Sequence, residues 1–156
     1  MERIASFTVD HDVLVPGLYL SRRDGQITTY DLRFKRPNTG DLLSNAEMHS
    51  VEHIIATALR NSEAKDAVIY FGPMGCQTGF YFLFDGAQLT ESEAIALLQN
   101  VFAQGAAWDA PMPGQSAPEC GNYINLDTAL ARKECAFYEA VIRDWTVEKL
   151  VYPTAE

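Results

Sequence analysis

The sequence predicts an α+β fold in which a mainly antiparallel sheet is covered by helices, within a single domain spanning residues 1–156. Three observations support this prediction. Apolar residues make up 47% of the chain and charged residues 21%, which are ordinary values for a globular protein. A length of 156 residues suits one domain with a substantial core. The local patterns follow one another as hairpin, helix, strand pair, helix and helix, without the regular alternation of a parallel α/β protein.

The region before residue 40 predicts a β-hairpin. Residues 13–21 are apolar and β-prone, and residues 27–34 alternate between apolar and polar side chains. Asp24-Gly25 lies between them and is typical of a hairpin tip. We therefore expect two antiparallel strands at the start of the sheet.

The rest of the chain predicts three helices and a second pair of strands. Apolar residues recur at helical spacing over 45–59, from about 90 to Gly105, and over about 128–144. Their predicted caps are Ser44 or Asn45, the Thr90–Glu93 capping box, and Asp127. Strand-like apolar runs at 67–71 and 80–85 flank a glycine-rich loop at 72–79. Residues 109–119 carry three prolines without periodicity and predict a loop, and the last dozen residues are expected to add little.

Charge and cysteine content limit the partners and the cellular location that the sequence predicts. A net charge of −9 and a pI near 4.7 argue against nucleic acid and anionic membranes as partners. No apolar run approaches the roughly 20 residues that span a bilayer, and the first residues lack the apolar core of a signal peptide. The chain has three cysteines, an odd number, which does not favour a disulfide framework. We therefore expect a cytoplasmic protein with reduced thiols.

The pentapeptide from His49 to His53 carries the strongest chemical signal. His49 and His53 are four residues apart, so a helix places both imidazoles on nearly the same face, where they can bind one metal ion. Glu52 reaches the same neighbourhood without having to be a ligand. The pattern H-x-x-E-H also occurs in metallopeptidases, in which the glutamate is the general base. Two histidines that share a face without binding a metal would be the plain structural alternative.

A catalytic metal site generally needs a third protein ligand and one open position. The candidates for that ligand are Cys120, Cys76, Cys135, His11 or a carboxylate. Cys120 follows a flexible Pro- and Gly-containing loop that could bring its sulfur to the helix. Cys135 is expected to be a packed structural thiol within a helix, and His11 taken alone is most simply a surface residue.

Cys76 lies between glycines in the predicted loop at 72–79. The loop has no lysine and does not match a phosphate-binding P-loop. Its glycine-rich context is consistent with an exposed, reactive thiol, although a small buried residue at a tight turn is an equally simple interpretation.

Taken together, these segments resemble the S-ribosylhomocysteine lyase (LuxS) family of autoinducer-2 synthases. Order and spacing agree from about residue 3 to the last helix. The segments that carry the resemblance are His49-Ser50-Val51-Glu52-His53, Pro73-Met74-Gly75-Cys76-Gln77-Thr78-Gly79, Glu119-Cys120-Gly121, Ser6-Phe7 with Asp10-His11, and Asp31-Leu32-Arg33-Phe34 with Pro37-Asn38.

The resemblance implies a cytoplasmic homodimer with its active sites at the subunit interface and one divalent metal ion per subunit, Fe(II) natively, with Zn or Co able to substitute. Its substrate, S-ribosylhomocysteine, would be cleaved to homocysteine and 4,5-dihydroxy-2,3-pentanedione, the precursor of a quorum-sensing signal, in the activated methyl cycle. The implied metal ligands are His49, His53 and Cys120. The implied acid/base residues are Cys76 and Glu52, and the implied substrate contacts are Ser6, His11 and Arg33.

This reaction suits the residue types. Breaking a thioether β to a carbonyl requires the sugar carbonyl to migrate first, and a metal ion in an open site would polarise the carbonyl as a Lewis acid. Moving protons between adjacent carbons needs groups such as a thiolate and a glutamate. Two rival interpretations are a metallohydrolase, in which Glu52 would activate water, and a metal-sensing or metal-storing module with a closed site.

Overall fold

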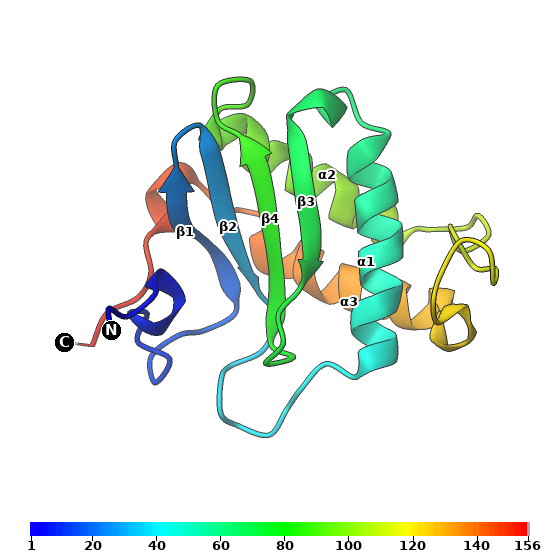
Figure 1. The fold of residues 1–156 in the computed structure, drawn as a ribbon, viewed down its shortest axis with the longest axis horizontal. Helices are drawn as coiled ribbons and strands as arrows, with labels where there is room; N and C mark the ends of the chain where they lie inside the picture. Colours follow the sequence, from blue (N-terminus) through cyan, green and yellow to red (C-terminus); the bar gives the residue numbers. More distant parts are fainter. Residues whose placement is uncertain (156) are drawn as a thin grey trace.

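In the computed structural model, which describes residues 1–155, the chain forms one four-stranded antiparallel sheet with three α-helices (Figure 1). The strand order is β1-β2-β4-β3. The elements are, in order, β1 (Gly17–Asp24), β2 (Ile27–Arg33), α1 (Asn45–Arg60), β3 (Val68–Pro73), β4 (Gly79–Asp85), α2 (Glu91–Ala106) and α3 (Thr128–Ile142). The α+β prediction is confirmed. The predicted domain extends to Glu156, which lies outside the described residues.

The first hairpin forms as predicted, with shifted boundaries. β1 begins at Gly17, four residues later than expected, directly after Pro16, which has no N–H to donate to a partner strand. Asp24 still pairs with Ile27, so the tip is Gly25-Gln26, and Gly25 takes the positive φ of 59° that this tight turn requires.

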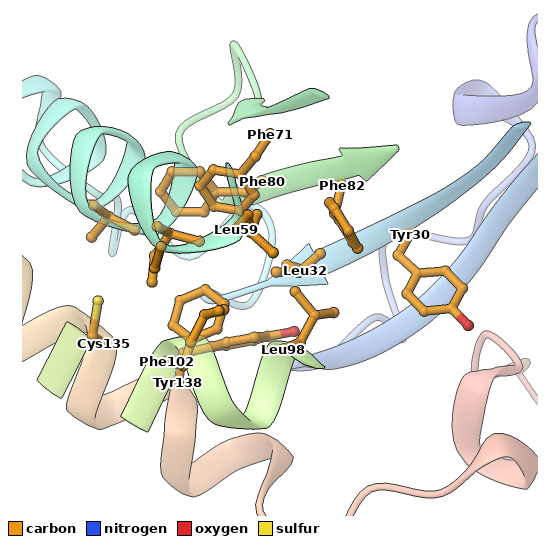
Figure 2. Close-up of a cluster of buried hydrophobic side chains, with 14 of the residues drawn as sticks. Tyr30, Leu32, Leu59, Phe71, Phe80, Phe82, Leu98, Phe102, Cys135 and Tyr138 are labelled. Atoms are coloured by element: carbon orange, nitrogen blue, oxygen red, sulfur yellow. The ribbon is translucent and has the colours of Figure 1, made fainter. Parts of the chain in front are cut away.

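The core lies between the sheet and the helices. In Figure 1, α2 and α3 run behind the sheet and α1 stands beside the β3 edge. Side chains alternate between the two faces of a strand, and one face carries the aromatic residues of the core. Phe71 and Phe80 stack at 5.1 Å between centroids, and Phe102 and Tyr138 from α2 and α3 meet edge to face (Figure 2). Each such buried ring contributes about 2–3 kcal/mol of hydrophobic stabilisation.

Cys135 belongs to this core, as predicted. Its side chain is fully buried on α3, and burial raises its thiol pKa to about 12, with a further increase from the charge of Glu134. A Cβ placed on Gly105 of α2 would lie 2.6 Å from the Cys135 sulfur, so the two helices pack in close contact here. Cys135 is therefore a structural thiol.

Local capping explains where the helices begin. Ser44 and Glu47 form a complete capping box at the start of α1, because each side chain bonds the backbone N–H of the other residue. At the start of α2 the box is only half formed, since the Glu93 carboxylate accepts from the Thr90 hydroxyl. Asp127 caps α3 as predicted.

A carboxyl pair joins α1 to α3. Burial and then a hydrogen bond with Glu47 raise the pKa of Glu134 to about 7, against the opposing charges of Lys35 and Lys133. Burial alone would raise the pKa of Glu47, but its hydrogen bonds with Glu134 and Ser44 outweigh burial and lower that pKa to about 2. Below about pH 7 the pair therefore holds one proton, which the raised pKa places on Glu134.

The end of the chain is structured, so the expectation that the last dozen residues add little is wrong. A 3-10 turn at Val147–Leu150 buries Leu150, and Tyr152 then stacks on Tyr19 of β1 at 5.0 Å. The first residues of the chain and residues 151–155 lie close together beside β1 (Figure 1). Within residues 1–155, no helix combines the length and the apolar character that crossing a membrane requires.

Candidate metal centre and the cavity beside Cys76

The two histidines of α1 meet Cys120 from the loop between α2 and α3. The Cys120 sulfur lies 3.3 Å from His49 Nε2 and 3.6 Å from His53 Nε2. All three side chains are partly buried, and among residues 1–155 they form the one group of His, Cys, Asp and Glu side chains that could hold a metal ion. Of the candidates for the third ligand, the structure therefore brings Cys120 to the histidine pair.

Both imidazoles are held by their other ring nitrogen. His49 Nδ1 lies 2.5 Å from Asn125 Oδ1, and His53 Nδ1 lies 2.7 Å from the carbonyl oxygen of Pro113. Both partners are hydrogen-bond acceptors, so each Nδ1 carries the proton and each Nε2 presents its lone pair toward Cys120. This is the arrangement that metal-binding histidines usually show. Sequence reasoning missed both partners.

The loop around Pro113 fits closely against His53. Gly114 has a positive φ of 69°, and a Cβ placed there would lie 3.2 Å from two atoms of the His53 ring. Glycine therefore allows the backbone to turn and to approach the imidazole at this point. Farther along this loop, the backbone N–H of Asn122 donates to the Cys120 sulfur at 3.5 Å, which helps to fix the position of the sulfur.

The donor set fits a divalent transition metal. Two imidazoles and one thiolate are typical ligands of Zn and Fe, and three protein ligands leave a position open for a substrate oxygen. Glu52 is partly buried on the same helix, about 100° around the axis from His53. It therefore lies beside the group of three and does not belong to it.

Four other predicted residues line a separate cavity of about 330 Å³: Ser6, His11, Arg33 and Cys76. Cys76 is exposed at the turn between β3 and β4, and its sulfur lies 3.0 Å from the Thr78 hydroxyl. Of the two interpretations that the sequence left open for Cys76, the structure supports the exposed thiol. His11 is partly buried with Nδ1 2.9 Å from the Val9 carbonyl, so it is not simply a surface residue.

Arg33 is 3% exposed and forms a buried ion pair with Asp31 beside Cys76. It donates to both Asp31 oxygens and to Thr78, and its Nη1 lies 4.0 Å from the Cys76 sulfur. Burial lowers the pKa of Arg33, but the Asp31 carboxylate outweighs burial, so that pKa is raised and the guanidinium stays charged. Cys76 therefore has a permanent positive charge as a neighbour.

Tyr152 completes this cavity, although sequence reasoning assigned it no role. Its hydroxyl donates to Asp31 at 2.7 Å. Burial, and then the charge of Asp31, raise the pKa of Tyr152 well above its usual range, so the hydroxyl keeps its proton. Asp31 thus accepts hydrogen bonds from both Arg33 and Tyr152.

The metal centre and the cavity beside Cys76 lie in different parts of the folded protomer. The loop from 107 to 125 lies beyond α1 as seen from the sheet, whereas the turn at 74–78 lies at one end of β3 and β4 (Figure 1). In the part of the chain that the structure describes, the two cavities beside Cys76 are lined without His49, His53 or Cys120. The candidate residues therefore form two groups.

Comparisons with known proteins agree with the resemblance. The family model described as S-Ribosylhomocysteinase (LuxS) matches residues 4–148. A protein of Desulfotalea psychrophila named S-ribosylhomocysteine lyase is 46% identical, over 99% of this chain and 100% of that protein. Proteins of the same name from Clostridium beijerinckii and Borrelia garinii are each 40% identical, over 98% of this chain and 99% and 100% of their own lengths. The chain belongs to the S-ribosylhomocysteine lyase (LuxS) family.

Proposed function

We propose that this protein is a metal-dependent carbon–sulfur lyase that converts S-ribosylhomocysteine into homocysteine and 4,5-dihydroxy-2,3-pentanedione. The observation that carries the proposal is the cluster of His49, His53 and Cys120, in a chain that belongs to the lyase family over nearly its whole length. The hydrolase and metal-sensing alternatives leave the cavity beside Cys76 without a role.

The cluster would bind one divalent ion per subunit, Fe(II) in the native enzyme, with Zn or Co able to substitute. The bound ion supplies Lewis acidity toward the carbonyl oxygens of the opened sugar. The orientation of both Nε2 atoms toward the Cys120 sulfur supports this ligand set. The open fourth position suits a substrate oxygen.

Glu52 and Cys76 are proposed to move the protons. During carbonyl migration a proton leaves one carbon and is delivered to its neighbour, which requires a base and an acid on the substrate. In the elimination, one group takes the proton next to the carbonyl while the C–S bond breaks, and the other protonates the departing sulfur. No water is consumed and no electron is lost, and Cys76 forms no covalent bond. The exposed position of Cys76 beside the Arg33 guanidinium, 4.0 Å from the sulfur, supports its assignment as one of the two proton-transfer groups.

Ser6, His11 and Arg33 are proposed to contact the substrate. All three line the 330 Å³ cavity beside Cys76, which supports this role. Most donors of Arg33 are already bonded to Asp31 and Thr78, so we expect Arg33 to act mainly through its charge. Ser6 and His11 have more capacity for direct hydrogen bonds to sugar hydroxyls.

The two groups of residues would be united in a homodimer. Cys76 and the metal ligands lie apart within one chain, so we propose that the cavity of one protomer faces the metal centre of its partner. Two large exposed side chains on the edge strand β3 support an interface, because Tyr70 and Ile69 expose 52% and 38% of their surface. The cytoplasmic location and the roles in quorum sensing and in the activated methyl cycle stay predictions.

The test is thiol release from S-ribosylhomocysteine by metal-loaded protein prepared without oxygen, followed with a thiol reagent. The parent should release homocysteine, and Glu52→Gln and Cys76→Ser should lose turnover by about 10²–10⁴-fold because each lacks an acid/base group. Metal analysis separates the roles of the cysteines. Cys76→Ala should retain its metal, whereas Cys120→Ala should lose it. Equal metal content and equal activity in the two alanine variants would contradict this assignment.

A further inference from the structure

Two asparagine side chains lie on the Nδ1 side of the His49 ring, and the proposed function gives them no role. Asn125 Oδ1 lies 2.5 Å from His49 Nδ1, and Asn125 Nδ2 lies 2.6 Å from Asn45 Oδ1. Asn125 is partly buried and belongs to a 3-10 turn at Tyr123–Asn125, five residues after Cys120. Asn45 is the first residue of α1.

Only one orientation of these groups is compatible with metal binding by His49. Its Nε2 must be unprotonated to bind the ion, so Nδ1 carries the proton and needs an acceptor. Asn125 must then present its amide oxygen to His49. Its NH₂ group consequently faces Asn45, and Asn45 must present its own amide oxygen to accept that hydrogen bond. The two amides thereby determine both the tautomer of the imidazole and the direction of its Nε2.

The same contacts connect the elements that carry the ligands. Asn125 ties the segment that follows Cys120 to the helix that carries His49. A second bond, from the Asp127 backbone N–H to the Ser50 hydroxyl at 2.9 Å, joins the same two segments independently. Removal of the Asn125 side chain should therefore leave the backbone in place and affect mainly the imidazole.

We propose that Asn125 is a positioning residue of the metal centre, which holds His49 in its metal-binding tautomer and is itself oriented by Asn45. The proposal rests on the proposed function only in taking His49, His53 and Cys120 as the ligands. An acceptor behind a metal-binding histidine typically changes metal affinity by about 10–100-fold. The His53 ring differs, because its acceptor is the Pro113 carbonyl, which no side-chain substitution removes.

The test is zinc affinity of the full-length apo-protein, measured by competition with a chromophoric chelator. Asn125→Ala should bind zinc about 10–100-fold more weakly than the parent. Asn125→Asp should restore affinity to within a few-fold, because its carboxylate accepts from Nδ1 and Asn45 can turn its own NH₂ toward it. Asn45→Ala should have a smaller effect in the same direction. The matched control is Ile124→Ala, since Ile124 lies in the same 3-10 turn and exposes 80% of its surface.

A purely structural role predicts a different pattern. It predicts that Asn125→Asp is no better than Asn125→Ala, and that the loss of zinc affinity matches a loss of stability in urea unfolding of the apo-proteins. Either that pattern or an Asn125→Ala affinity within threefold of the parent overturns the proposal. If the parent itself binds no zinc, the metal centre and this proposal both fail. If the parent binds zinc without releasing homocysteine, the proposed function fails while the affinities still decide the role of Asn125.

Discussion

Replacing Gly114 by alanine tests how closely the loop between α2 and α3 must fit the metal centre. Gly114 has a φ of 69°, a conformation that costs an L-residue about 1 kcal/mol. Its new Cβ would also lie 3.2 Å from the His53 ring, closer than an ordinary van der Waals contact. The close contact is relieved if the loop moves away from His53 by a few tenths of an ångström, whereas the cost of the positive φ remains.

That movement would weaken the bond from His53 Nδ1 to the Pro113 carbonyl, which is 2.7 Å long. We expect Gly114→Ala to lower the unfolding free energy of the apo-protein by about 1 kcal/mol. We expect it to weaken zinc binding by about tenfold, because the imidazole loses the acceptor that orients it. Urea unfolding and chelator competition measure the two effects separately.

Gly121→Ala is the matched control, because it lies in the same loop beside Cys120 and a Cβ there would meet nothing within 4 Å. It should behave as the parent in both measurements. If Gly114→Ala binds zinc as tightly as Gly121→Ala, the contact between this loop and His53 does not orient the ring.

Two further predictions concern residues outside the metal centre. Tyr152→Phe removes the hydroxyl that donates to Asp31 at 2.7 Å. It should lower the unfolding free energy, measured in urea, by about 1.5 kcal/mol, as expected for a hydrogen bond to a charged group. An unchanged unfolding free energy would mean that water replaces the hydroxyl. Burial and Glu47 raise the pKa of Glu134 from its ordinary 4.5 to about 7, so the contribution of Glu134 to stability is complete below pH 4.5 and is lost as the pH rises through 7. Glu134→Gln, which is neutral at every pH, should match the parent near pH 4 and be more stable by about 3 kcal/mol at pH 8. A stability difference that is the same at both pH values would contradict this shift.

The parts of the fold that depend on local sequence could be predicted. α1 begins at Asn45 after the Ser44 cap, and its histidines share a face because they are four residues apart on a helix. The hairpin turn lies one residue later than predicted, because Asp24 still pairs with Ile27 at the end of β1 and β2. Such shifts depend on pairing across the sheet, which a single strand pattern does not specify.

The surroundings of the site could not be predicted, because they arise from tertiary contacts. The acceptor for His53 is a backbone carbonyl, which any residue could provide, so its sequence position carries no signal. Asn125 lies 76 residues from His49, and Tyr152 lies 121 residues from Asp31. Family resemblance implied which side chains bear the chemistry, whereas the structure was needed to show what orients them.

Homocysteine release by a defined heterodimer requires both the lyase reaction and a site shared between protomers, so one assay examines both. A protomer with Cys120→Ala would be paired with one with Cys76→Ala through different affinity tags. We expect about half of the parent's activity, because one of the two sites then combines an intact metal centre with an intact Cys76. The converse pair, a parent protomer with one that carries both substitutions, should be inactive. Activity in the converse pair and none in the first would contradict the account.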